Sequence, residues 1–143
     1  MKIFIYYDNS HIHLKELINS MLLEFSHEIF EIPLTNDLNE LIEEVKNLLN
    51  NNKNSLSIIL MNDYIEFSIK INKFEKIRCS PLLTKIEAKL TKEHNNSNIL
   101  ATSSNFIENN FLIDIIRTYI TTPFSEVDRH KLRVDLIEKN FNI

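Results

Sequence analysis

Short runs of apolar residues alternate along the chain with longer stretches in which apolar residues recur every three or four positions. A short apolar run of this kind is typical of a buried strand, and the longer spacing is typical of a helix with one buried face. The alternation continues to the end of the chain. It predicts strands at residues 2–7, 27–32, 57–61, 76–79 and 97–102.

Helices are predicted between these strands and after the last one. The first carries apolar residues from Leu14 to Leu22, and the second can be capped by Asp37. The other four cover residues 64–72, 82–94, 106–120 and 128–141. Strands that alternate with helices form βαβ units, so the predicted fold is α/β, a three-layer α/β/α sandwich with a five-stranded, mostly parallel Rossmann-like sheet. Because no repeat or boundary interrupts the pattern, residues 1–143 are expected to form one domain.

Composition narrows the function classes. The net charge of -4 and the pI near 5.7 argue against a nucleic-acid partner, which favours a basic face. No stretch approaches the roughly 18 apolar residues of a membrane span, and Asp8 comes too early for a signal peptide. Cys79 is the only cysteine, so it has no partner for an intrachain disulfide. We therefore expect a cytoplasmic protein without a membrane partner.

The chain contains no glycine, although average usage would give roughly ten in a protein of this length. Any backbone position that needs a positive φ must therefore use Asn, Asp or a strained residue. A glycine-rich phosphate loop is also absent, which excludes Walker and dinucleotide-binding fingerprints.

In a parallel sheet, ligands bind outside the carboxyl ends of the strands. The positions to inspect are Tyr7 to Asn9, residues 61–66, Ser80 and the pair Ser103-Ser104. Asp8, Asp63 and Glu66 would converge there, and a hydrated Mg²⁺ site is conceivable because hard cations favour carboxylates. No suitably placed lysine follows the fifth predicted strand, however, and we expect neither a metal nor a cofactor.

Four segments, in order and at matching spacing, carry a resemblance to a known family. They are MKIFIYYDNSHIHLKELI, FSIKINKFEKIRC, TKEHNNSNILATSS and TPFSEVDRHKLRVDLIEK. The chain resembles the ribose-5-phosphate isomerase B / galactose-6-phosphate isomerase family across nearly its full length. The resemblance implies metal-free aldose–ketose isomerisation of a phosphorylated sugar, and a dimer in which the C-terminal helix takes part. It also implies an active site that spans two subunits.

The half of the site that one subunit supplies to itself is degenerate here. The family's aspartate is kept as Asp8, but its proton-abstracting cysteine corresponds to Met61, and the glycine-rich loop reads Asn62, Asp63, Tyr64, Ile65, Glu66. An anion hole needs N–H groups aimed at developing negative charge, and two carboxylates now stand there. Some relatives use a glutamate as the base, but this chain has Phe67 at the corresponding position. Glu66 as a replacement base is possible but not favoured.

The half that a subunit donates to its neighbour is kept. His94 and Asn95 match the ring-opening pair, and Arg129, His130 and Arg133 match the segment that holds the phosphate. Without the family, His94-Asn95 would be a helix C-terminus with Asn95 in the left-handed region, and the basic segment would be a solvated helix start. Two guanidinium groups one helical turn apart nevertheless suit a phosphate.

This asymmetry gives the leading hypothesis. Galactose-6-phosphate isomerase is built from two kinds of chain, and this chain is similar to the kind that also lacks the cysteine loop. It would donate His and Arg residues to a site on a paralogous partner. The alternative is a non-catalytic homodimer, a pseudoenzyme that binds a phosphosugar or has a structural role. Whether the chain is an enzyme by itself is left open.

Overall fold

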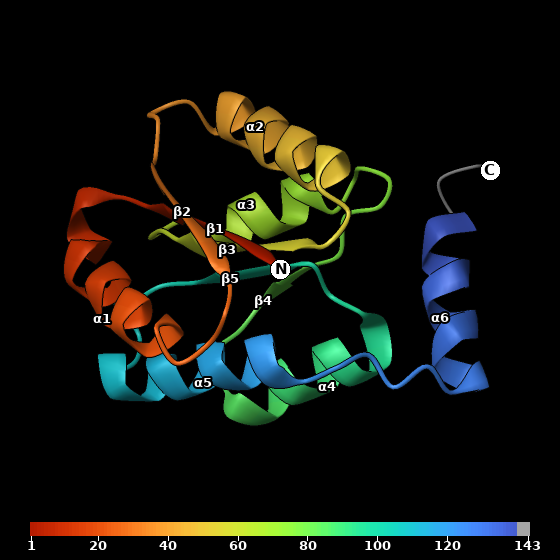
Figure 1. Cartoon of the computed structure of the whole chain (residues 1–143). Helices are drawn as coiled ribbons and strands as arrows, with labels where there is room; N and C mark the ends of the chain where they lie inside the picture. The colour runs from red at the N-terminus through yellow and green to blue at the C-terminus, as the bar shows by residue number, and fades with distance from the viewer. Residues whose placement is uncertain (140–143) are drawn as a thin grey trace.

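The computed structural model describes residues 1–139, which form a parallel five-stranded sheet with helices on both faces (Figure 1). The strand order is β2-β1-β3-β5-β4, and every neighbouring pair is parallel. The predicted α/β sandwich is therefore confirmed. The strands are β1 (Lys2–Tyr7), β2 (Glu28–Pro33), β3 (Ser55–Leu60), β4 (Cys79–Pro81) and β5 (Ile99–Thr102).

Alternate residues of the central strands point into two separate cores. Ile3 and Ile5 of β1 face one helical layer, and Phe4 and Tyr6 face the other. Because both faces of the sheet are covered, the strands read as continuous apolar runs in the sequence. The helices are α1 (Ile12–Leu22), α4 (Lys85–Asn95) and α5 (Asn109–Thr121) on the first face, and α2 (Leu38–Asn51) and α3 (Tyr64–Ile71) on the second.

The last helix, α6 (Asp128–Lys139), stands beside the sheet and contacts the end of α4 (Figure 1). Its predicted start is confirmed, but residues 140 and 141 of the predicted helix lie outside the described residues. Leu132 and Leu136 leave one face of α6 exposed. Within residues 1–139, no helix has the length and apolarity needed to cross a membrane.

The fourth strand begins three residues later than predicted and ends two residues later. Lys76 has a φ of 63°, and the backbone N–H of Arg78 donates to Asn98 Oδ1 at 2.9 Å. The turn at Lys76 and the side-chain bond at Arg78 take the place of ladder pairing by their N–H groups, so Cys79 begins β4 instead of ending it.

Three residues of the described chain have positive φ, and none is glycine. Asn96 ends α4 in the left-handed region, as expected for a chain that must use Asn there. Lys76 and Glu126 are strained instead, since a side chain with a Cβ costs about 1–2 kcal/mol in this conformation. The left-handed residue at the end of α4 is Asn96, one position after the predicted Asn95.

Candidate functional site

The carboxyl ends of β1, β3 and β5 bring most of the predicted positions to one edge of the sheet. Asp8 follows β1, Met61 follows β3, and Ser103 and Ser104 follow β5, and these three strands are neighbours. Ser80 is not at this edge, because it lies inside β4 and its hydroxyl contacts Ser97 Oγ at 3.1 Å.

A fully buried histidine links two of these loops. His11 lies in the short 3-10 helix Asn9–His11 and is 0% exposed. Its Nδ1 is 2.6 Å from Asp8 Oδ1, and its Nε2 accepts the backbone N–H of Ser104 at 3.2 Å. Because Nε2 is an acceptor, this network assigns the proton to Nδ1, which donates to the carboxylate. His11 therefore holds Asp8 against the loop that follows β5.

The Asp8 carboxylate is stabilised in its charged form. Ser10 Oγ donates to the same oxygen, Oδ1, at 2.6 Å. Burial alone would raise the pKa of the Asp8 carboxyl, but hydrogen bonds from Ser10 and His11 outweigh it and bring that pKa below its usual range. Asp8 can thus act as an ionised hydrogen-bond acceptor and is unsuited to act as an acid near neutral pH.

Ser103, His11 and Asp8 superficially form a nucleophile–base–acid series. Ser103 Oγ lies 3.4 Å from His11 Nε2, but Ser103 is fully buried and its oxygen accepts the backbone N–H of Asn105 at 3.2 Å. A nucleophile must reach its substrate, so this series has a structural role.

Met61 occupies the position at which the family resemblance implies a proton-abstracting cysteine. Met61 carries a thioether, which has no proton to exchange, and Phe67 is 0% exposed in the core between the sheet and α3. Glu66 Oε1 pairs with Lys70 Nζ at 3.0 Å along α3, with 58% of the Glu66 side chain exposed. Met61, Phe67 and Glu66 therefore provide no base beside an enclosed pocket.

Polar and aromatic side chains link the loop after β3 to the loop after β5. Asn105 Nδ2 donates to Asn62 Oδ1 at 2.7 Å, and the ring of Tyr64 lies 6.1 Å from that of Phe106. Asp63 precedes α3 without accepting a capping hydrogen bond from its own helix. Bare N–H groups at a helix start attract an anion. At the start of α3, Asp63 and Glu66 instead place two carboxylates.

The acidic residues of this edge do not form a metal site in the described part of the chain. Asp8 is bound by Ser10 and His11, and Glu66 by Lys70. No group of three or more His, Cys, Asp or Glu side chains is placed to hold an ion within residues 1–139.

The second predicted group gathers where α4 ends and α6 begins. The rings of His94 and His130 are 4.2 Å apart at an interplanar angle of 31°. Ser125 anchors this contact, because its backbone N–H donates to Glu93 O at 3.1 Å and its hydroxyl contacts His130 Nδ1. The start of α6 is thereby fixed against the end of α4.

His130 is the buried member of this cluster and is only 2% exposed. Arg129 Nε donates to His130 Nε2 at 3.3 Å, which makes the ring an acceptor on that side. Burial lowers the pKa of His130, and the neighbouring positive charges lower it further. Arg129 and Arg133 are exposed, and neither pairs with a carboxylate within residues 1–139.

The two groups lie at opposite edges of the sheet. Helix α4 runs back across the sheet from the carboxyl end of β4, so its last residues, His94 and Asn95, lie beside the amino ends of the strands (Figure 1). Asp8 and Met61 follow the carboxyl ends of β1 and β3. One chain cannot bring both groups to the same ligand.

Cys79 belongs to neither group. It is buried, and its Sγ donates to Ser68 Oγ at 3.4 Å. Burial raises the pKa of its thiol to about 12, which leaves almost no thiolate at neutral pH. It behaves as a small core residue.

Known proteins resemble this chain both in sequence and in fold. The profile of the Ribose/Galactose Isomerase family matches residues 3–137. The chain belongs to this family. Ribose-5-phosphate isomerase B of Mycobacterium leprae is 30% identical over 83 residues, which are 58% of this chain and 51% of that protein. YwlF of Bacillus subtilis is 36% identical over 87 residues, 58% of each chain, so these alignments span little more than half of the relatives.

Solved structures extend the likeness to the whole fold of the chain. Ribose 5-phosphate isomerase of Thermotoga maritima superimposes with a TM-score of 0.80 at 28% identity and covers 96% of this chain and 97% of its own. Ribose-5-phosphate isomerase B of Clostridium thermocellum gives a TM-score of 0.85 at 25% identity, covering 99% and 98%.

Sequence reasoning missed the role of His11. The residue is at the position of a family glycine, and its spacing of three from Asp8 was the available signal. A turn of helix places residues three apart on one side, which lets the imidazole return to the carboxylate.

Proposed function

We propose that this chain is a partly degenerate isomerase subunit that donates side chains to a composite sugar-phosphate site on a paralogous partner. The single observation that carries the proposal is the separation of the two groups. The amino edge has exposed guanidinium groups beside an ordered imidazole, whereas the carboxyl edge has Met61 at the position where the family resemblance implies a proton-abstracting cysteine. Side chains that cannot serve their own chain can serve a neighbour's.

Each donated residue has a distinct task in the proposal. His94 is the proton carrier for opening the sugar ring, because an imidazole exchanges protons near neutral pH, and Asn95 contacts the sugar hydroxyls. Arg129 and Arg133, one turn apart on α6, hold the phosphate through charge-assisted hydrogen bonds. His130 positions His94 by a tilted ring contact and accepts the Nε–H of Arg129.

The partner supplies what this chain lacks. Its cysteine abstracts the proton from the sugar carbon, and the N–H groups of its loop stabilise the enediolate. Asp8 remains here as an ionised acceptor, held by His11 and Ser10, which suits contact with sugar hydroxyls but not proton abstraction.

Purification with and without a loop-bearing paralogue tests this proposal. We expect ribose or galactose phosphate isomerisation only from the mixed assembly, and loss of that activity when Arg133→Ala is introduced into this chain. The matched control is Lys131→Ala, an exposed cation on the same helix. Activity from this chain alone, abolished by Glu66→Gln, would contradict the partner role.

The second candidate is a non-catalytic homodimer that binds a phosphosugar. The link from Asp8 through His11 to Ser104 favours it, because the network ties the loops together without a reactive group. Calorimetry with ribose 5-phosphate separates the candidates. Binding by the chain alone that is lost in Arg133→Ala, with no activity in any mixture, would favour the homodimer.

A further inference from the structure

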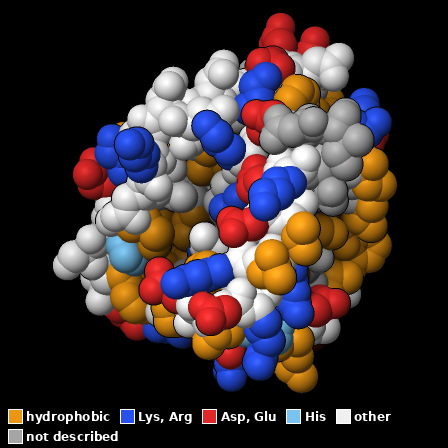
Figure 2. Space-filling model, turned by 90° about the vertical axis from the view of Figure 1, so that its right-hand side faces the viewer, with side chains coloured by type: hydrophobic (Ala, Val, Ile, Leu, Met, Phe, Trp, Pro, Cys, Tyr) orange, Lys and Arg blue, Asp and Glu red, His pale blue; other side chains and the backbone are white. Residues whose placement is uncertain are grey.

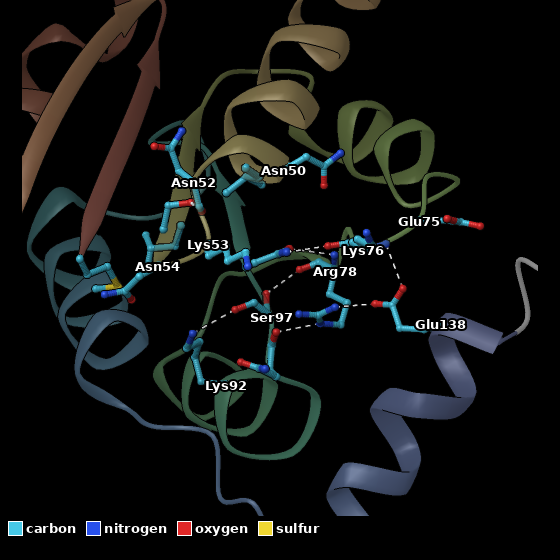
Figure 3. A pocket seen from close by; sticks show the side chains of 16 residues that line it. Asn50, Asn52, Lys53, Asn54, Glu75, Lys76, Arg78, Lys92, Ser97 and Glu138 are labelled. Atoms are coloured by element: carbon cyan, nitrogen blue, oxygen red, sulfur yellow. Dashed lines mark hydrogen bonds and ion pairs between the residues drawn. The ribbon is translucent and has the colours of Figure 1, made fainter.

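A cavity of about 730 Å³ lies at the amino edge of the sheet, away from Asp8 and Met61. Its walls come from the end of α2, the loop before β3, the loop before β4, the end of α4 and one residue of α6. Figure 3 shows Lys53 on one side, Arg78 and Ser97 facing it, Lys92 on α4, and Glu138 reaching in from α6. The face that contains it is hollowed and carries both signs of charge (Figure 2).

The cavity concentrates positive charge in an acidic protein. Lys53, Lys76, Arg78 and Lys92 line it against two carboxylates, although the chain has a net charge of -4. The carboxylate of Glu138 is already engaged, since its Oε1 lies 2.5 Å from Arg78 Nη1 and its Oε2 accepts the Lys76 backbone N–H at 2.9 Å. The ammonium groups of Lys53 and Lys76 pair with no carboxylate within the described residues 1–139.

Two of the cationic side chains are held in place before any ligand arrives. Arg78 Nε donates to Asn96 O at 2.8 Å, and Lys92 Nζ donates to Ser97 O at 3.0 Å. Burial, followed by the charge of Arg78, lowers the pKa of Lys92 to about 8. A lysine drawn out of water beside another cation is stabilised by an anion, and its ordering lowers the entropic cost of binding one.

The size and the lining restrict the ligand. Ligand pockets commonly measure about 300–1,000 Å³, so this one has room for a small metabolite. The rest of its wall is rich in carboxamides, which hydrogen-bond polar groups and do not favour an apolar ligand. We propose that the cavity binds a small phosphate-bearing metabolite, with Lys53, Arg78 and Lys92 contacting the phosphate. This site is separate from Arg129 and Arg133.

Titration calorimetry at low ionic strength, with inorganic pyrophosphate as the probe, tests this site. Lys92→Gln removes a lining charge, and Lys89→Gln removes an exposed charge three residues away on the same helix. We expect pyrophosphate binding in the cavity to be about tenfold weaker in Lys92→Gln and unchanged in Lys89→Gln, since a charge-assisted contact has roughly this effect. Lys53→Gln, in an exposed loop, provides a second variant with little risk to folding.

Two further arms separate ligand sources and sites. Ribose 5-phosphate and adenosine monophosphate, titrated in the same way, distinguish a sugar phosphate from a nucleotide. Arg133→Ala should leave the pyrophosphate binding that depends on Lys92 unchanged. Absence of binding, equal weakening by Lys89→Gln and Lys92→Gln, or loss only in Arg133→Ala would overturn the proposal, and the last result would still support the donated phosphate site on α6.

Discussion

The two edges of the sheet have been built in opposite ways. At the carboxyl edge, Asp8 is bound by His11 and Ser10, and the neighbouring loops are joined to one another. At the amino edge, Arg129 and Arg133 are exposed without an acidic partner in the described residues, and a positively lined cavity lies nearby. At the first edge Asp8, Asn62 and Asn105 pair within the chain, while at the second the guanidinium groups of Arg129 and Arg133 have no carboxylate partner among residues 1–139.

Under the proposed function, the difference marks where the family's chemistry is lost while the fold is kept. The sheet and both cores depend on apolar residues such as Ile5 and Tyr6, which do not require the catalytic loop. Under the proposed function, Met61 stands in place of the cysteine and Asn62, Asp63 and Tyr64 in place of loop residues of the family, while the sheet keeps its order. A preserved fold is weak evidence for preserved chemistry.

The largest expected effect comes from the amino edge. Replacing both Arg129 and Arg133 by alanine should lower kcat/KM of the mixed assembly by about 100-fold or more, because two charge-assisted contacts to phosphate are lost. Steady-state isomerisation assays measure this, with Lys131→Ala as the control. A drop of less than about threefold would place the phosphate elsewhere.

The next effect is on stability at the carboxyl edge. His11→Ala should lower the free energy of unfolding by about 2–3 kcal/mol. The variant loses a buried imidazole that makes two hydrogen bonds, and Asp8 and Ser104 each lose a hydrogen-bond partner. His13→Ala, on the exposed side of α1, should change it by less than about 0.5 kcal/mol. Urea unfolding of both variants gives the comparison, and equal values would show that the His11 network contributes nothing.

A pH effect of the order of 1 kcal/mol should come from Lys92. Its pKa is lowered to about 8 in the folded chain from 10.5, so the unfolded chain binds more protons between these values. Stability should therefore rise with pH from about 8 to 10.5, and Lys92→Gln should remove that rise. Partial solvent access keeps the effect small. Denaturant unfolding across this pH range measures the effect, with Lys89→Gln as the control. If stability still rises with pH in both variants, the rise does not come from Lys92.

The smallest effect is expected at Glu66. Because this residue makes an exposed ion pair with Lys70, Glu66→Gln should change stability by no more than about 0.5 kcal/mol. It should leave the activity of the mixed assembly unaltered. A loss of activity beyond the loss in Lys70→Gln would identify Glu66 as a base and remove the contrast between the edges.

The sequence predicted the order of elements and the type of fold for two reasons. Strands buried on both faces give continuous apolar runs, and helices give apolar residues at every third or fourth position. β1 has the predicted bounds, and Asp37 caps α2 by accepting the backbone N–H of Asn39 at 2.8 Å. β4 was misplaced because it has only three residues and follows a left-handed Lys76 that no local pattern announces.

The candidate site residues were chosen from family spacing. The grouping of His94 with Arg129 and Arg133 depends on a tertiary contact between α4 and α6, which only the segment match suggested. The amino-edge cavity was missed, because its lining comes from five separate segments and ligands were expected at the other edge. The local sequence around Lys53 predicts only a polar loop.

Complementation of a crippled partner tests the central claim most directly. A loop-bearing paralogue that has lost its own ring-opening histidine and phosphate-binding arginines should be inactive by itself. Added wild-type chain should restore sugar-phosphate isomerisation, and the Arg129→Ala, Arg133→Ala variant should not. Failure of the wild-type chain to restore activity, or equal restoration by the variant, would contradict the account.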